Sequence, residues 1–404
     1  MRVMITLPNI GGGGAETHFI NLTRELRRRH VEVQFALMRP EGPLLERLKE
    51  VSEVVPLLPA GVVTWLRRLE SVPVTRYLAR RRVVRLAVCL FGGAIRRLRQ
   101  VLEEHRVDVV LSALWEGDLI TGSAVAGMPT ARRPRWVVAA AFELEARLRR
   151  SVTGGFWLPP LRRVYERADA FVAPSSRIAS QLATLIVSES RVPIWMIPNA
   201  VPVDALSAVA ATTAASGASG GDAGPNDALR LVAVGRLVPE KGFDVLLKAL
   251  AQVRKRFPTT TLTMIGHGPS GPYLERLAKG LGLQNAVVWA GFLQNPFPLM
   301  ASARMLVAPS RWETFGNAVA EAMALGVPVV ATRCGGPEDL IESGVSGVLV
   351  PVDDIEALAR AIIGLLADDR SRQQMGWAAQ RKAVQFSASA VAGRYLESFS
   401  TLVG

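Results

Sequence analysis

The sequence is poor in the residues that build disulfide frameworks and cysteine-rich metal centres. Its 404 residues include two cysteines, Cys89 and Cys334, and four histidines. Two cysteines cannot form a disulfide network, so a reducing compartment is the natural environment. We therefore expect a cytoplasmic protein that needs no metal or other cofactor.

Long apolar runs are also missing. No stretch of about 18 consecutive apolar residues occurs, so no transmembrane span is expected. The first residues meet Gly11–Gly14 where the apolar region of a signal peptide would continue, so we expect no secretion. What is present is a composition of 49% hydrophobic and 21% charged residues, which predicts a folded chain of two or three domains.

The net charge of +13 is distributed unevenly. Residues 1–202 contain 30 Lys and Arg against 18 Asp and Glu, whereas residues 203–404 contain 18 against 17. A basic half attracts nucleic acid, an anionic membrane or a phosphorylated acceptor. Because zinc-finger, RNP and helix-turn-helix signatures are missing, nucleic acid is not expected. The stretch 76–99 reads as a solvated helix or as one lying on the inner face of a membrane.

Short apolar runs alternate with helical segments along the chain. This alternation predicts parallel sheets covered by helices, an α/β fold. The expected strands are 2–7, 31–38, 107–112, 136–141, 170–174, 229–234, 261–265, 287–290, 305–308, 327–331 and 347–350.

A segment rich in Ala, Ser, Thr and Gly interrupts the alternation. We predict a flexible linker over 203–228, between a first domain over 1–202 and a second over 229–386. Residues 387–404 are amphipathic and predict a closing helix that docks back on the first domain.

The stretch 308–331, APSRWETFGNAVAEAMALGVPVVA, reads as strand, loop, helix and strand. Gly316 and Asn317 stand where the loop enters the helix, whose free N–H groups suit an anion or sugar hydroxyls. Glu313 and Glu321 are eight residues apart, which is 80° off alignment on one helix. Both can reach the same ligand only if Glu313 lies in the loop. Solvated helix charges are the alternative.

A second motif, VGRLVPEKG, follows the first strand of the second domain. It places Arg236 and Lys241 at a strand's carboxyl end, where open α/β sheets bind ligands and where two cations could neutralise a diphosphate. Surface charge is the alternative. Gly266 in IGHGP and Gly335 in CGGPEDL mark further tight turns.

The glycine run Gly11–Gly14 with Glu16 lies between the first strand and the first helix. It fits neither the dinucleotide fingerprint nor a P-loop, because the acidic ribose partner and Gly-Lys-Ser/Thr are missing. The glycine run would still allow the backbone to approach a phosphate or an acceptor closely.

Together these motifs resemble the retaining glycosyltransferases of the GT-B fold, family 4. The resemblance rests on GGGGAE, GRLVPEKG, GHGP, ETFGNAVAEAMA and CGGPED, which occur in the order typical of that family. It implies two Rossmann-like domains facing a central cleft, the first binding the acceptor and the second the donor. The implied reaction moves a sugar, with retention, from a nucleoside diphosphate sugar, expected to be a UDP-sugar, to a lipid-linked or polysaccharide acceptor.

The resemblance also implies roles for individual residues. Arg236 and Lys241 would hold the diphosphate, Glu313 and the backbone of residues 315–317 the sugar, and Glu321 the ribose. The implied catalytic set is Glu313, Arg236 and Lys241. The implied donor-binding set is Gly13, Gly14, Arg236, Lys241, Gly266, Glu313, Phe315, Gly316, Asn317 and Glu321.

One departure concerns the acceptor side. Many members carry a histidine after a strand of the first domain, where this chain reads WVVAAAFELEA. Glu143 is the nearest polar candidate, with Glu16 as a second acceptor-side residue, although a structural salt bridge would also explain Glu143. A sugar phosphorylase or hydrolase and a non-catalytic nucleotide-sugar-binding protein therefore remain the alternatives.

Overall fold

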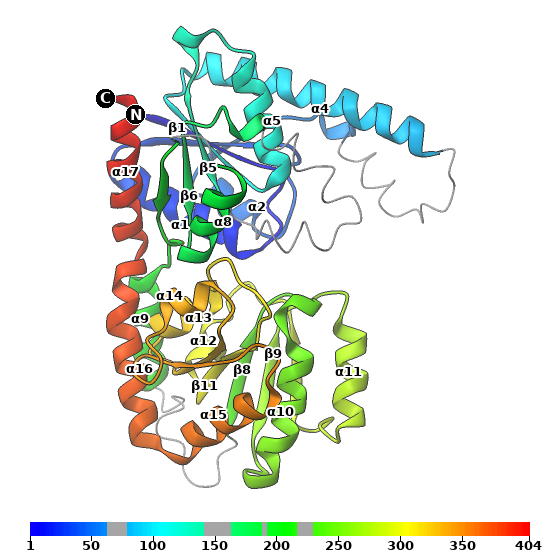
Figure 1. Cartoon of the computed structure of the whole chain (residues 1–404), viewed down its shortest axis with the longest axis vertical. Helices are drawn as coiled ribbons and strands as arrows, with labels where there is room; N and C mark the ends of the chain where they lie inside the picture. The colour runs from blue at the N-terminus through cyan, green and yellow to red at the C-terminus, as the bar shows by residue number, and fades with distance from the viewer. Residues whose placement is uncertain (63–78, 141–162, 188–191, 216–228) are drawn as a thin grey trace. The chain divides into compact units, whose positions relative to one another are not determined.

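A computed structural model gives the architecture of the chain (Figure 1). It describes residues 1–62, 79–140, 163–187, 192–215 and 229–404. The chain divides into two compact units. Unit 1 comprises Met1–Pro174, Ile178–Ile197 and Ala392–Gly404, and unit 2 comprises Ser175–Arg177 and Pro198–Val391.

Unit 1 is built on a parallel sheet with the strand order β3-β2-β1-β4-β5-β6-β7. The strands are β1 (Arg2–Leu7), β2 (Glu32–Leu37), β3 (Glu53–Pro56), β4 (Val109–Ala113), β5 (Arg135–Ala139), β6 (Ala170–Ala173) and β7 (Ile194–Met196). The helices are α1 (Gly14–Arg28), α2 (Leu45–Lys49), α4 (Ala79–Glu104), α5 (Trp115–Ala126), η1 (Thr130–Arg132) and α8 (Ser176–Leu185). Apolar side chains of β1, β4 and β5, including Met4, Val110 and Val138, pack with α4 and α5 in one core.

Unit 2 is built on a second parallel sheet, with the order β10-β9-β8-β11-β12-β13. Its strands are β8 (Arg230–Val234), β9 (Thr261–Ile265), β10 (Val287–Gly291), β11 (Met305–Ala308), β12 (Val329–Thr332) and β13 (Val348–Val350). Its helices are α9 (Val203–Ala215), η2 (Pro239–Lys241), α10 (Phe243–Arg256), α11 (Gly271–Gly280), α12 (Phe297–Ala301), α13 (Asn317–Ala324), α14 (Gly336–Leu340), α15 (Ile355–Ala367), α16 (Asp369–Ala383) and η3 (Val384–Phe386). The last helix, α17 (Ala388–Val403), contains the boundary between the units.

Alternate residues of the unit 2 strands bury opposite faces of the sheet. Leu231 and Met264 join a core with α10, α11 and α15, whereas Val232 and Ile265 join another with α13. Strands buried on both faces carry continuous apolar runs, which is why they could be read from the sequence. The prediction of two parallel-sheet α/β domains is confirmed.

The structure differs from the sequence prediction at three places. Residues 203–215, expected in a linker, form α9, which buries Val203 and Leu206 in unit 2. Its alanines favour a helix once those two side chains have a core to enter. The rest of the expected linker lies outside the described residues. The strands β3 and β7, of four and three residues, were not predicted.

The C-terminal helix was expected to dock on the first domain. Residues Ala392–Gly404, which include most of α17, belong to unit 1, where the hydroxyl of Tyr395 lies 3.3 Å from His18 Nε2 on α1. Within the described ranges, no helix is both long and apolar enough to cross a bilayer.

Candidate functional site

The candidate site lies at the carboxyl edge of the unit 2 sheet. Strand order reverses between β8 and β11, because β9 and β10 extend from one side of β8, and β12 and β13 from the other side of β11. Loops at such a reversal splay apart and leave room for a ligand. The sequence motifs that follow β8, β9, β11 and β12 all end at this edge.

Two predicted catalytic residues meet here. Lys241, which ends η2 after β8, donates through Nζ to Glu313 Oε1 in the loop after β11. Both side chains are largely buried, at 25% and 16% exposed. Glu313 precedes α13, which starts at Asn317, so the geometric condition for Glu313 and Glu321 to serve one ligand is met.

The carboxylate of Glu313 is held on more than one side. Ser310, itself buried, donates to Glu313 Oε1 at 2.8 Å. The backbone of Glu313 bonds the loop after β12 twice, donating to Cys334 O and accepting from Gly336 N, each at 3.1 Å. The ETFGN and CGGPED motifs are therefore one structural unit.

The Cys334 thiol lies in the same loop and is buried. Burial, with the nearby Glu313 charge adding to it, raises the pKa of Cys334 to about 12. The thiol therefore stays protonated at neutral pH and is not a nucleophile.

Arg236, the second predicted diphosphate ligand, is exposed on the turn that follows β8. Among the described residues, its guanidinium makes no hydrogen bond or ion pair. A cation at a sheet's carboxyl edge with no protein partner is available to an anionic ligand.

Glycines allow the turns of this edge to approach one another. At Gly266, a Cβ atom would stand 1.9 Å from Gly235 O, so the loops after β8 and β9 are in direct backbone contact at this point. Gly242 has a φ of +63°, and a Cβ there would stand 2.0 Å from Pro309 O. Gly266 thus has a packing role, and its donor contact stays a prediction.

The start of α13 holds the remaining donor-site candidates. Gly316 is the N-cap, and Asn317 Oδ1 accepts a 3.0 Å hydrogen bond from Asn199. The Phe315 ring is buried in the core against Phe386, so only the backbone of Phe315 is left to face a ligand. Glu321 is half-buried on α13.

The predicted residues of the first domain belong to unit 1. Gly13 is the N-cap of α1 and Gly14 its first residue, while Glu16 is 7% exposed. The Glu16 carboxylate lies against Gly13, because a Cβ on Gly13 would stand 2.7 Å from Glu16 Oε2. Glu143 lies outside the described residues. The donor and acceptor roles of these residues stay predictions.

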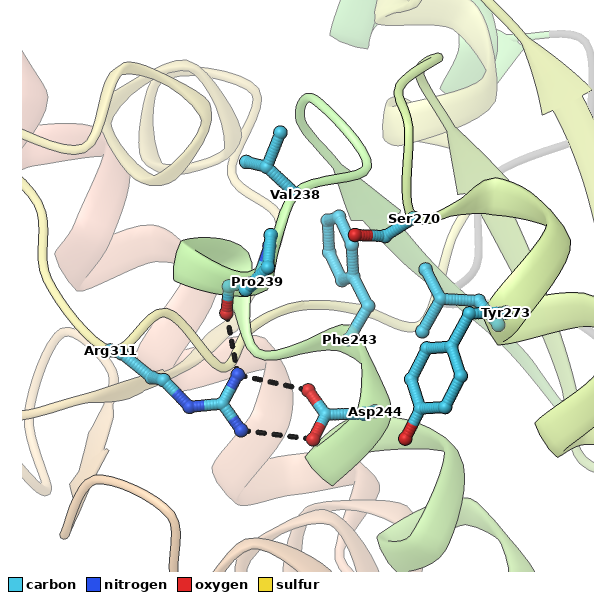
Figure 2. A pocket seen from close by; sticks show the side chains of 8 residues that line it. Val238, Pro239, Phe243, Asp244, Ser270, Tyr273 and Arg311 are labelled. Carbon is cyan, nitrogen blue, oxygen red and sulfur yellow. Dashed lines mark hydrogen bonds and ion pairs between the residues drawn. The ribbon is translucent and has the colours of Figure 1, made fainter. Parts of the chain in front are cut away.

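Sequence reasoning missed a second charged cluster beside the site. Arg311 forms a bidentate pair with Asp244 of α10, with Nη1–Oδ1 at 3.0 Å and Nη2–Oδ2 at 2.9 Å (Figure 2). Its Nε contacts Asp353 at 2.8 Å, and its Nη1 also donates to Pro239 O. Burial disfavours the Asp244 carboxylate, but the hydrogen bonds from Arg311 outweigh this and hold the pKa of Asp244 below its ordinary value. Arg311 lies two residues before Glu313, within the stretch 308–331 that the sequence analysis singled out. This position was the sequence signal that could have identified it.

A small cavity of about 110 Å³ borders this cluster (Figure 2). It is lined by Val238, Pro239, Phe243, Asp244, Ser270, Tyr273, Leu274 and Arg311. No three His, Cys, Asp or Glu side chains gather as a metal site would require in the parts of the chain that the structure describes.

Comparison with solved structures shows the fold. The chain matches Anabaena HepE in complex with UDP and glucose with a TM-score of 0.76, at 22% identity, over 99% of this chain and 100% of that one. It matches sucrose-phosphate synthase from Thermosynechococcus elongatus with a TM-score of 0.78, at 19% identity, over 100% of this chain and 99% of that one. The two parallel-sheet units are those of the GT-B fold.

Sequence comparison defines the family. Residues 12–205 match the model described as Glycosyltransferase Family 4, and residues 228–368 match Glycosyl transferases group 1. A GDP-mannose-dependent alpha-(1-6)-phosphatidylinositol monomannoside mannosyltransferase of Mycolicibacterium smegmatis is 31% identical over 71% of this chain and 75% of its own length. The lipopolysaccharide core biosynthesis glycosyltransferase LpsE of Rhizobium meliloti is 35% identical over 43% of this chain and 50% of its own. The chain belongs to the group 1 glycosyltransferases, family 4.

The match to LpsE spans half of that relative's length and 174 residues of this chain. The match to the mannosyltransferase extends over 301 residues. Family membership therefore rests on the longer match together with the two family models.

Proposed function

We propose that the protein transfers a sugar, with retention, from a nucleoside diphosphate sugar to a lipid-linked or polysaccharide acceptor. A UDP-sugar is the expected donor. The observation that carries the proposal is the pair of cations, Arg236 and Lys241, on one turn at the strand-order reversal of unit 2. Of the two, Arg236 is exposed and has no protein partner among the described residues.

In this proposal the two cations act on the leaving group. The diphosphate gains negative charge as the glycosidic bond breaks, and cations placed beforehand around it lower the barrier. Lys241 is already oriented by Glu313, so little reorganisation is needed when the diphosphate arrives. No metal is expected to be required, because the side-chain cations supply the positive charge.

Glu313 would bind a hydroxyl of the donor sugar. Ser310 and Lys241 both contact its Oε1, which leaves Oε2 for a ligand hydroxyl. A front-face transfer through an oxocarbenium-like species requires no enzyme nucleophile, so Glu313 orients the sugar and forms no covalent bond. The N-terminus of α13 and Glu321 would complete the donor site.

The acceptor is proposed from charge and relatives together. Residues 1–202 hold the excess of basic residues, which suits an anionic acceptor or the surface of an anionic membrane. The relatives named above are, by their descriptions, a lipopolysaccharide core enzyme and a phosphatidylinositol mannoside enzyme. We propose that the protein works peripherally at the inner face of the membrane.

A donor panel tests the proposal. Purified protein is incubated with UDP-glucose, UDP-galactose and GDP-mannose, with and without a lipid extract, while nucleotide release and product anomer are followed by NMR. We expect nucleoside diphosphate release that depends on the extract, and a product with the donor's anomeric configuration. Sugar or sugar phosphate released without a nucleotide would support a phosphorylase or hydrolase, and binding without turnover a non-catalytic binding protein. An inverted anomer would overturn retention.

A further inference from the structure

We propose that Arg311 is a positioning residue that fixes the loop carrying Lys241 against the loop carrying Glu313. The inference rests on the proposed function, because it assigns the pair Lys241–Glu313 to donor binding. Arg311 itself reaches neither of these side chains in the structure. Its contacts lie on the segments that carry them.

The contacts of Arg311 enclose Lys241 on both sides in the sequence. Before Lys241, Arg311 bonds two carbonyls, with its backbone N–H donating to Glu240 O at 2.7 Å and its Nη1 donating to Pro239 O. After Lys241, its guanidinium holds Asp244 in the first turn of α10. The segment from Pro239 to Asp244, which contains Lys241, is therefore held at both ends by the Arg311 side chain and at Glu240 by its backbone.

Arg311 itself belongs to the loop after β11, which carries Glu313. It stands two residues before Glu313 and directly after Ser310, whose hydroxyl donates to the Glu313 carboxylate. The segment 310–313 thus carries both the Ser310–Glu313 hydrogen bond and Arg311, which holds the turn that contains Lys241. We name Arg311 with Asp244, Pro239 and Glu240 the loop clamp.

The chemistry of arginine explains why this residue type stands here. A planar guanidinium offers several N–H donors in fixed directions, and Arg311 uses them on Asp244, Asp353 and Pro239. A lysine would retain the charge but cannot form a bidentate pair. The loop clamp therefore depends on geometry as well as on charge.

The alternative reading is that Arg311 only stabilises the first turn of α10. The two readings differ in what the substrate experiences. A displacement of about 1 Å at a reacting group costs on the order of 100-fold in rate. Loss of the loop clamp should therefore lower turnover far more than it lowers stability.

The test compares Arg311→Met, Arg311→Lys and Asp244→Asn with the wild type. Arg360→Met is the matched control, because Arg360 lies on α15 of the same unit in an exposed pair with Glu356. Three kinds of measurement are made: kcat and KM for transfer, the Kd of UDP and GDP, and amide exchange of Lys241, Arg311 and Glu313 in the unliganded protein.

We expect Arg311→Met to lower kcat about 100-fold, to weaken nucleoside diphosphate binding about 10-fold, and to speed exchange of the three amides. Arg311→Lys should resemble Arg311→Met, and Asp244→Asn should follow in the same direction. Arg360→Met should match the wild type throughout. Should Arg311→Met fail to fold, Asp244→Asn decides, because it keeps the shape of the side chain.

Faster exchange with kcat and Kd within twofold of the wild type would overturn the positioning role. Full rescue by Arg311→Lys would also overturn it, since charge alone would then suffice. If the wild type neither binds a nucleoside diphosphate nor transfers a sugar, the proposed function fails, and the amide exchange still reports on the loop clamp. In that case unchanged exchange in Arg311→Met would overturn the coupling of the two loops.

Discussion

The two units share one architecture, but an aspartate in each responds to its surroundings in the opposite direction. In unit 1, Asp118 is fully buried and accepts hydrogen bonds from Ser112 and Tyr165, each at 2.7 Å. Burial raises the pKa of Asp118 to about 7 and lowers the pKa of His18 to about 3. In unit 2, the pKa of Asp244 is instead held below its ordinary value by Arg311.

This difference indicates which part of the shared fold carries charged groups that can bind a ligand. Asp118 and His18 of unit 1 are held near or in their neutral forms, and their hydrogen bonds link parts of the core. Unit 2 keeps charged pairs at the carboxyl edge of its sheet, where a ligand can exchange partners with them. Function is therefore argued from the edge of unit 2, because the fold alone is compatible with many activities.

The sharpest test of the comparison is Lys241→Ala. It removes a cation that stabilises the leaving diphosphate, and loss of one such group costs about 100- to 1,000-fold in rate. Steady-state kcat/KM for donor should fall by that factor in a variant that circular dichroism shows to be folded. Lys279→Ala on α11 is the control, since that lysine is exposed and outside the site. Near-normal turnover of folded Lys241→Ala would refute the diphosphate role.

The neutral network of unit 1 predicts a pH dependence of stability. The folded pKa of Asp118 is raised, so the folded state binds the proton more tightly than the unfolded state does. The stability that Asp118 contributes is therefore fully present below about pH 4 and is lost as pH rises toward 7. One pKa unit corresponds to about 1.4 kcal/mol, so the loss reaches a few kcal/mol.

Urea denaturation of wild type and Asp118→Asn across this pH window isolates that contribution. The asparagine does not ionise, so the difference between the two free energies of unfolding should decline from low to high pH. A difference that stays constant with pH would mean that Asp118 is not the titrating group.

The backbone contact between the loops after β8 and β11 of unit 2 predicts a smaller loss of stability when it is disturbed. Gly242→Ala places a Cβ against Pro309 O at a φ of +63°, which should cost about 1–3 kcal/mol of unfolding free energy. Gly280→Ala at the end of α11 is the control, because a Cβ there meets nothing within 4 Å. Equal denaturant midpoints for the two variants would contradict the close approach.

The smallest expected effect concerns α17. Tyr395→Phe removes the hydroxyl facing His18 and should cost about 1 kcal/mol of unfolding free energy. Denaturation monitored by circular dichroism measures it. Activity should change little, because neither side chain belongs to the candidate site. A loss of turnover comparable with that of Lys241→Ala would break the division of roles between the units.

Much of the fold was predictable because parallel strands are apolar throughout. The runs at 229–234 and 261–265 mark β8 and β9 within a residue. The linker prediction over 203–215 was wrong, because an alanine-rich stretch has no visible periodicity, and only the core reveals that Val203 and Leu206 are buried. The common location of Arg236 and Lys241 after β8 was predictable because the two residues share a motif, and their roles in donor binding stay predictions.

Partners distant in the sequence could not be predicted. Arg311 and Asp244 are 67 residues apart, and Lys241 and Glu313 are 72 apart. Only the strand order brings β8 beside β11 and makes these pairs possible. From the sequence, solvated surface charge was the simpler interpretation of Lys241 and Glu313, and Arg311 and Asp244 were not singled out.

The account depends most on the diphosphate contact at the carboxyl edge of unit 2, and calorimetry tests it directly. Wild type and Lys241→Ala are titrated with UDP, UMP, GDP and GMP. The wild type should bind the diphosphate of its preferred nucleoside at least about 10-fold more tightly than the monophosphate, because an added charge-assisted contact contributes about 1.5 kcal/mol or more. Lys241→Ala should lose most of that preference. No binding of either diphosphate to folded wild type, or equal affinity for mono- and diphosphates, would contradict the account.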